Sequence, residues 1–215
     1  MPIDPVLLSH AEQELHCFFA KHAVKGFLHH DEGMALYQAA LAVQGPCLEI
    51  GSYCGKSAVY IAMACQLNGT SLYAVDHHRG SEEHQPGEAY HDPDLFERQS
   101  QRVNTLPALQ RTLALADLED TVLPIVASSA VVVRDWATPL ALVFIDGGHS
   151  HDSAHHDCTR WADKLSPGGV LAVHDIFAKP EEGGQGPYLA MQAVLQRGDF
   201  TLEKQVRSLA LLRKQ

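Results

Sequence analysis

Short runs of apolar residues alternate along this chain with longer stretches in which apolar positions recur at helical spacing. Each run has the length of a buried strand, and apolar residues occupy both of its faces. Strands of this kind, separated by helices, are typical of a parallel sheet that is covered on both sides. The pattern therefore predicts an α/β protein. The five predicted strands are residues 47–50, 71–75, 122–127, 140–145 and 170–173, and the clearest helices between them are 56–67 and 150–165.

A helical segment precedes this alternation. Residues 4–44 have helical patterns with a break near Lys25 and Gly26. We therefore expect residues 1–44 to be an N-terminal helical extension of a domain that spans 45–215. The apolar face of the extension has two alternative uses: it covers a ligand pocket, or it forms the contact of a homodimer.

The C-terminal end adds two more strands. Only two residues separate apolar runs at 200–206 and 209–212, and so short a link requires an antiparallel pair, because a parallel crossover needs about a dozen residues. The predicted fold is a doubly wound, mostly parallel seven-stranded sheet with an antiparallel last strand.

Three connections carry specific predictions. Asp92 and Pro93 form a good N-cap and first-turn pair, so we expect helical structure from there to about Leu118. Residues 166–169, Ser-Pro-Gly-Gly, predict a turn before the fifth strand. The polar stretch 77–92 is long for a loop in a compact domain. Loops of that length are commonly lids or binding loops, and the alternative is a surface loop without a ligand.

Composition and charge narrow the function classes. The 215 residues contain 16 Lys and Arg against 26 Asp and Glu, a formal net charge of −10. Nucleic acids and anionic membranes bind through clustered basic residues, so we expect neither as a partner. No apolar run approaches the roughly 18–20 residues of a membrane span, and we expect no signal peptide. Five cysteines without a Cys-x-x-Cys pair fit the reducing cytoplasm, our expected location.

The candidate ligand site begins where the first strand ends. In open α/β sheets, ligands bind beyond the carboxyl ends of the strands. Glycines there let the backbone approach a ligand, and the following helix N-terminus offers free N–H groups to a carboxylate or phosphate. The spacing is not the Gly-x-Gly-x-x-Gly of dinucleotide-binding proteins, which disfavours NAD. The stretch concerned is Glu49-Ile50-Gly51-Ser52-Tyr53-Cys54-Gly55-Lys56-Ser57.

A carboxylate at the end of the second strand strengthens this prediction. Asp76 lies 25 residues after Gly51, where its two oxygens can accept both hydroxyls of a ribose. Charge-assisted hydrogen bonds of this kind contribute roughly 1.5–3 kcal/mol each. The alternatives are a tight turn without a ligand and an exposed aspartate at a strand end, but the two features together favour a ribose.

Three stretches of the chain resemble the class I S-adenosylmethionine-dependent methyltransferases, whose fold is Rossmann-like. The resemblance covers about residues 24–178. Within that class, the chain is similar to the group of macrocin-type O-methyltransferases and cephalosporin-hydroxylase-like proteins. The resemblance is most specific in FIDGGHSH with the following PGGVLAVHD, and nearly as specific in EIGSYCGKS. The stretches are CLEIGSYCGKSAVYIA, LYAVDHH and ALVFIDGGHSHDSAHHDCTRWADKLSPGGVLAVHDIF.

The resemblance implies a role for each matching position. Six residues would line the methionine part of the cofactor, Asp76 would hold its ribose, His77 would flank the adenine, and Ser128 with Ser129 would contact the adenine edge. His149 matches the proposed general base of the family. The six residues are Glu49, Gly51, Ser52, Tyr53, Gly55 and Ser57.

The resemblance also implies a divalent metal beside the methyl group, bound by Asp146, which borders the cofactor pocket as well, and by His174 with Asp175. Geometry supports a site there, because the fourth and fifth strands of a doubly wound sheet are neighbours about 4.8 Å apart. Consecutive strand residues point to opposite faces, so His174 and Asp175 can both bind only where the chain has left the sheet. An imidazole ligand shifts preference from Mg²⁺ towards Mn²⁺, Fe²⁺ or Zn²⁺. The alternative is that Asp146 only borders the cofactor and His174 is a packed strand-end histidine.

These observations lead to one main functional hypothesis and two alternatives. The chain is interpreted as an S-adenosylmethionine-dependent O-methyltransferase of a small-molecule hydroxyl, assisted by a divalent metal. Such a metal lowers the pKa of the hydroxyl, and His149 takes the proton; His149 could instead belong to the cap of the following helix. The first alternative is a catalytically silent protein of this fold that binds S-adenosylmethionine or a metal, and the second is an NAD-binding enzyme.

Overall fold

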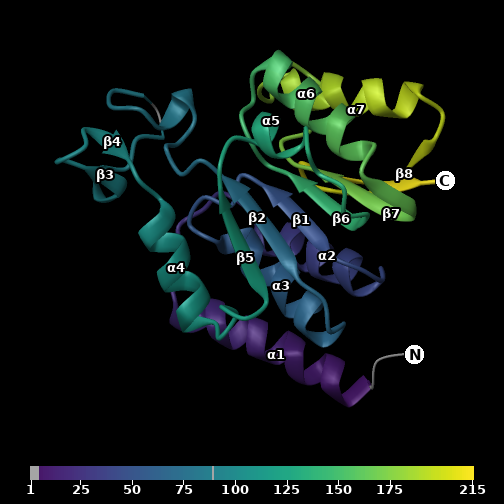
Figure 1. Cartoon of the computed structure of the whole chain (residues 1–215), viewed down its shortest axis with the longest axis horizontal. Helices are drawn as coiled ribbons and strands as arrows, with labels where there is room; N and C mark the ends of the chain where they lie inside the picture. The colour runs from purple at the N-terminus through teal and green to yellow at the C-terminus, as the bar shows by residue number, and fades with distance from the viewer. Residues whose placement is uncertain (1–4, 89) are drawn as a thin grey trace.

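A seven-stranded sheet forms the centre of the protein, with helices around it (Figure 1). The computed structural model describes residues 5–88 and 90–215. The strand order is β5-β2-β1-β6-β7-β9-β8. The first five of these strands are parallel, and β9 is antiparallel to both of its neighbours. The predicted doubly wound sheet with an antiparallel last strand is confirmed. The strands are β1 (Cys47–Ile50), β2 (Leu72–Asp76), β5 (Val122–Val126), β6 (Leu140–Ile145), β7 (Leu165–Val173), β8 (Phe200–Val206) and β9 (Leu209–Lys214).

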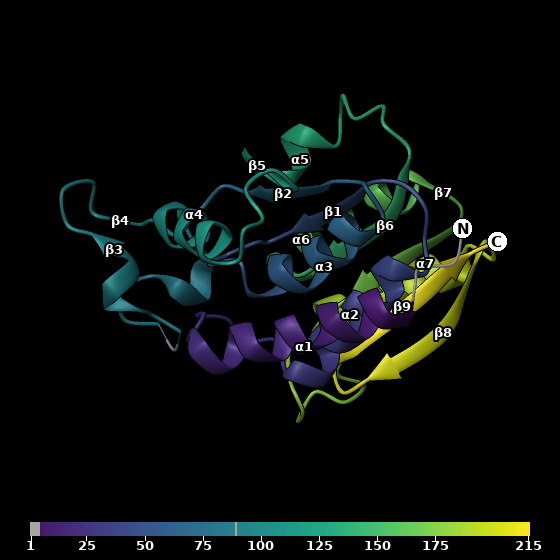
Figure 2. The ribbon, with the colours of Figure 1, turned by 90° about the horizontal axis from the view of Figure 1, so that it is seen from below.

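Helices cover both faces of the sheet. One face packs against α1 (Pro5–Lys21), α2 (His30–Leu41), α3 (Lys56–Leu67) and α4 (Leu106–Leu115). Figure 2 shows α1 and α2 beside α3. Both helices of the predicted extension therefore share a core with the sheet, and the domain boundary at residue 44 stays a prediction. The other face packs against α5 (Ser129–Val132), α6 (His151–Ala162) and α7 (Gly186–Gln196).

The central strands are apolar because they have no exposed face. All four residues of β1 and all six of β6 are buried. Each strand contributes alternate residues to two cores, one under α2 and α3 and one under α6 and α7. Burial on both sides removes the apolar–polar alternation of a half-exposed strand. For this reason the continuous apolar runs predicted the positions of the central strands well.

The helix predicted to start at Asp92 is wrong in its first half. Asp92 does cap a turn, accepting a hydrogen bond from the backbone of Asp94, but that 3₁₀ turn ends at Leu95. A small hairpin follows, formed by β3 (Phe96–Glu97) and β4 (Arg102–Val103), and α4 begins only at Leu106. The physical reason is tertiary: Leu95 and Val103 are buried together against Cys54, outside the two main cores.

The turn predicted at residues 166–169 is also corrected. These residues lie inside β7, which begins at Leu165 and continues to Val173. Gly168 has a φ of +77°, and the pairing of β7 with β6 shifts its register between Leu140 and Leu142. The Pro-Gly-Gly sequence therefore makes an irregularity within a strand instead of ending one. Among the described residues, no helix is long and apolar enough to cross a bilayer.

Candidate active site

A cavity of about 440 Å³ opens beyond the carboxyl ends of β1, β2, β6 and β7. This is the location that the strand pattern predicts for a ligand. Nine of the predicted site residues line it, so the fold brings together segments far apart in the sequence. They are Gly51, Ser52, Tyr53, Ser57, Asp76, His77, Asp146, His149 and Asp175.

The turn after β1 can be made only with glycine at its first position. Gly51 has a φ of +90°, and a Cβ there would overlap the backbone carbonyl oxygen of Asp146. The chain then turns through Gly55, also at φ +90°, into the N-terminus of α3. The turn and the first N–H groups of α3 therefore lie against the cavity, a suitable surface for a negatively charged group.

Asp76 is tied to that turn through its carboxylate. Its Oδ2 accepts a hydrogen bond from the backbone N–H of Tyr53 at 2.9 Å, and its Oδ1 accepts one from the N–H of His78 at 2.7 Å. The two bonds fix the orientation of a side chain that is 14% exposed. Each carboxylate oxygen can accept a further hydrogen bond, so the group is prepared for the two hydroxyls of a ribose.

Two buried polar atoms near the turn have no hydrogen-bond partner among the described residues. One is Oε1 of Glu49, whose Oε2 accepts from the Ser57 hydroxyl at 2.9 Å, and the other is the hydroxyl of Ser52. Burial raises the pKa of Glu49 to about 8. Buried polar atoms are nearly always paired, so these two mark a place where a polar ligand group would complete the structure.

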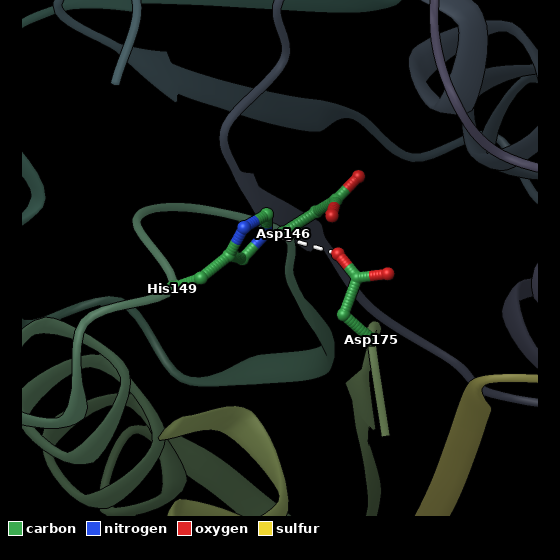
Figure 3. A group of neighbouring side chains, drawn as sticks. All are labelled: Asp146, His149 and Asp175. Carbon is green, nitrogen blue, oxygen red and sulfur yellow. Dashed lines mark ion pairs between the residues drawn. The ribbon is translucent and has the colours of Figure 1, made fainter. Parts of the chain in front are cut away.

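The carboxyl ends of β6 and β7 bring two carboxylates and a histidine together. Asp146, His149 and Asp175 each offer one ligand atom within 4.8 Å of the others (Figure 3). The β7 strand ends at Val173, and Asp175 adopts a φ of +56°, so the chain has left the sheet before this carboxylate. We call Asp146, His149 and Asp175 the acidic cluster.

His149 lies between two carboxylates. Its Nε2 is 2.9 Å from Oδ2 of Asp175, and its Nδ1 is 3.3 Å from Oε2 of Glu83. The hydrogen bond to Asp175 raises the pKa of His149 to about 9. The imidazole is therefore protonated at neutral pH in the protein without ligands, and a protonated ring cannot accept a proton.

His174 borders the acidic cluster from the protein interior. Only 5% of its side chain is exposed, and its Nδ1 is 3.0 Å from Oδ1 of Asp146 and 3.5 Å from Oδ2 of Asp175. Its Nε2 lies 3.2 Å from Glu32 on α2. Burial lowers the pKa of His174, but the surrounding carboxylates, Asp146 first among them, raise it by more.

Two predicted cofactor residues lie away from the cavity. Ser128 is exposed at the start of α5, and the hydroxyl of Ser129 donates to Asp157 at 2.5 Å and accepts from Trp161 at 2.8 Å. Neither lines the cavity, and their proposed contact with an adenine stays a prediction. Gly55, which shapes the turn, and the fully buried Glu49 do not line the cavity either.

Two segments border the cavity mouth, and the sequence pointed to only one of them. Glu83, His84 and Tyr90 come from the long loop after β2, which we expected to be a candidate binding loop, whereas Phe27 comes from the link between α1 and α2, where no site residue was expected. The Phe27 and Tyr90 rings make an edge contact, with centroids 5.1 Å apart. Loop length pointed to the segment after β2, but only the break between two helical patterns marked the link between α1 and α2.

Comparison with known families adds an independent finding. A family model described as a methyltransferase domain matches residues 48–176, which include the turn after β1, Asp76 and the acidic cluster.

Solved structures resemble the whole chain at low sequence identity. An O-methyltransferase from Streptomyces achromogenes, TomG, solved in complex with SAM, has a TM-score of 0.62 at 19% identity over 96% of this chain and 88% of its own. An O-methyltransferase from Bacillus cereus, in complex with SAH, has a TM-score of 0.61 at 15% identity over 100% and 93%. The SAH-bound Podospora anserina methyltransferase PaMTH1 has a TM-score of 0.64 at 13% identity over 95% and 87%. These likenesses establish the fold, which is the Rossmann-like methyltransferase fold.

Proposed function

The chain belongs to the methyltransferase-domain family, and from that premise we propose that it transfers a methyl group from S-adenosylmethionine to the hydroxyl of a small molecule, with a divalent metal as helper. One observation carries the proposal: a single cavity contains both the Asp76 carboxylate with its glycine turn and the acidic cluster at the ends of β6 and β7. The first suits a nucleoside, and the second suits a cation beside the reacting group.

The residues near the turn fit the cofactor. The two free acceptor positions of the Asp76 carboxylate suit the ribose hydroxyls, and the N-terminus of α3 suits the methionine carboxylate. The unpaired Oε1 of Glu49 and the unpaired hydroxyl of Ser52 suit the methionine amino group, because both oxygens could accept hydrogen bonds from its N–H groups. Similar folds solved with SAM or SAH, including TomG, support this assignment.

The donor atoms near the acidic cluster fit a divalent metal. Asp146 and Asp175 would supply carboxylate oxygens. Of the two neighbouring histidines we assign His174 as the nitrogen ligand, because its Nδ1 faces both aspartates, and we leave His149, the third member of the acidic cluster, for the proton. Two oxygens and one nitrogen suit Mn²⁺, Fe²⁺ or Zn²⁺ better than Mg²⁺. When bound, such a cation would lower the pKa of the acceptor hydroxyl and offset the negative charge on Asp175 that keeps His149 protonated.

The side chains of the cavity have distinct tasks in this reaction. Asp76 and the glycine turn would hold the donor in the cavity that also contains the acidic cluster. His149 lines the cavity, and its Nε2, which pairs with Asp175 in the protein without ligands, would accept the proton of the acceptor hydroxyl once the ring is neutral. Glu83, 3.3 Å from the other ring nitrogen, holds the imidazole in place from the loop after β2.

The rival function is a catalytically silent binder of the same cofactor or metal. The observation that favours it is the 2.9 Å contact of His149 Nε2 with Asp175, which raises the pKa of the imidazole and makes it a poor base in the protein without ligands.

Binding and turnover test the proposal separately. Calorimetric titration with S-adenosylhomocysteine should give a defined affinity, whereas NAD should give no heat of binding. Incubation with methyl-labelled S-adenosylmethionine, Mn²⁺ and a set of phenols and sugars should then transfer the label to one of these two acceptor classes. Addition of EDTA should prevent the transfer. Binding without transfer to any acceptor would favour the silent protein, and the absence of S-adenosylhomocysteine binding would contradict both readings.

A further inference from the structure

A fully buried glutamate connects α2, through His174, to the acidic cluster. Glu32 has no exposed surface, and it lies outside the residues that the family model matches. Its Oε1 accepts from the backbone N–H and the hydroxyl of Ser208, at 3.0 and 2.8 Å. Its Oε2 accepts from the N–H of His29 at 2.9 Å and faces Nε2 of His174 at 3.2 Å. The carboxylate thus joins α2, the β8–β9 turn and the residue after β7.

Capping of α2 does not explain why this carboxylate is buried. The bond from Glu32 to the His29 backbone is an ordinary helix-cap interaction, which a carboxylate at the surface makes equally well. The preceding residue, Asp31, stands in the same first turn, is exposed and pairs with Arg207. Burying a charge is costly unless it is paired. The partners that hold Glu32 in the interior are His174 and Ser208.

The ring that Glu32 holds presents its other nitrogen to the site. Nε2 of His174 faces Glu32, and Nδ1 faces Asp146 at 3.0 Å and Asp175 at 3.5 Å. Histidines that bind metals almost always donate their other ring N–H to a carboxylate, a carbonyl or water, which fixes the tautomer and the ring orientation. The arrangement of Glu32, His174 and the two aspartates has this form.

We propose that Glu32 is a positioning residue of the metal site: it holds the Nε2–H of His174, so that Nδ1 faces the cation together with Asp146 and Asp175. The inference rests on the proposed function, because it specifies how this chain would build that site. It makes α2 part of the site, although α2 lies before the matched methyltransferase domain. The nitrogen that Glu32 orients also gives the site its preference for Mn²⁺ or Zn²⁺ over Mg²⁺.

Calorimetric titration of the full chain with MnCl₂ tests this role without any need for turnover. Loss of a partner that orients a metal ligand typically weakens metal binding about 10–100-fold. We expect a loss of that size for Glu32→Gln. The matched control is Asp31→Asn, the same change one residue earlier at an exposed position, which should alter the Mn²⁺ affinity less than about twofold. The affinity for S-adenosylhomocysteine should be the same in all three proteins.

The outcomes separate the two proposals. If the wild type does not bind Mn²⁺, the metal site itself is wrong. If the wild type binds Mn²⁺ and Glu32→Gln binds it equally well, only the role of Glu32 is overturned. A parallel loss of Mn²⁺ and S-adenosylhomocysteine affinity in Glu32→Gln would show a general structural defect and would also overturn the specific role.

A spectroscopic measurement on the wild type does not depend on whether the variant folds. Imidazole ¹⁵N–¹H spectra should detect the Nε2–H of His174 in the protein without metal. Addition of Zn²⁺ should shift the Nδ1 resonance to the position of a metal ligand, while the Nε2–H signal persists. Loss of the Nε2–H signal, or an unchanged Nδ1 resonance with Zn²⁺ bound, would overturn the proposal.

Discussion

The carboxylate of Asp76 accepts a hydrogen bond of 2.9 Å from the backbone N–H of Tyr53, and this bond ties the end of β2 to the glycine turn after β1. The contact crosses two neighbouring parallel strands at the edge where their carboxyl ends meet. It fixes the carboxylate towards the cavity before any ligand arrives, so little ordering remains to be done on binding.

Replacement of Asp76 should therefore weaken cofactor binding specifically. In Asp76→Asn we expect the dissociation constant for S-adenosylhomocysteine to rise about 10–100-fold, because two charge-assisted hydrogen bonds lose the ionised acceptor. Isothermal titration calorimetry measures the change. The control is Asp152→Asn, the same change at an exposed carboxylate outside the cavity. Equal affinities for wild type and Asp76→Asn would remove Asp76 from the cofactor site.

The close approach at Gly51 predicts that an alanine substitution there destabilises the fold more than one at Gly87, which has a similar backbone angle. Gly51 has a φ of +90° and Gly87 a φ of +96°, but a Cβ on Gly51 would overlap a backbone carbonyl, whereas a Cβ on Gly87 meets nothing within 4 Å. Gly87→Ala should destabilise the fold by about 1 kcal/mol, the cost of the left-handed conformation alone. Gly51→Ala should cost clearly more, because backbone cannot move aside as a side chain does. Urea denaturation compares the two, and similar losses would contradict the crowded turn.

The buried Glu49 predicts that stability falls as the pH rises. Its folded pKa, about 8, lies above the 4.5 of an unperturbed glutamate, so the folded state binds more protons between these values. Wild-type stability should decline across that range, by an amount on the order of a few kcal/mol. Glu49→Gln removes this decline, so it should be more stable than the wild type at pH 8.5, an advantage that disappears towards pH 5. The exposed Glu119→Gln is the control. Urea denaturation at several pH values would contradict the account if the advantage of Glu49→Gln were independent of pH.

The contact between His149 and Asp175 predicts that the pKa of His149 depends on the charge of Asp175. Asp175 raises the pKa of His149 to about 9, above its unperturbed value of 6.5. The pairing therefore adds stability below pH 6.5, and this contribution is lost as the pH rises through 9. In Asp175→Asn the pKa of His149 should fall towards or below 6.5, as measured by ¹⁵N NMR of the metal-free protein. Asp152→Asn, which lies beside the exposed His151, should leave the His149 pKa unchanged. A His149 pKa near 9 in Asp175→Asn would assign the shift to another group.

Prediction from the sequence succeeded where one physical rule dominates. β1, α3, β6 and β8 have the predicted bounds, because continuous burial, glycine punctuation and short links leave few alternatives. The strand-end rule also placed Asp76, Asp146 and Asp175 at one cavity. The prediction of a helix from Asp92 was wrong because burial of Leu95 and Val103, a tertiary effect, ends the helical turn that Asp92 caps.

The parts of the site that depend on distance could not be predicted. Glu32 stands next to Asp31 in a helix of ordinary pattern, and only packing decides that one is buried and the other exposed. The protonation of His149 follows from the 2.9 Å contact with Asp175, and a sequence carries no such distance. Phe27 and Tyr90 meet across a gap of more than sixty residues, from two irregular segments.

A crystal structure of the protein grown with S-adenosylhomocysteine and MnCl₂, with anomalous data recorded for manganese, tests the central claim most directly. The account predicts the ribose hydroxyls on the carboxylate of Asp76, and a manganese peak between Asp146 and Asp175 in the same cavity. A nucleoside bound elsewhere, or a cavity closed by the protein's own side chains, would contradict it.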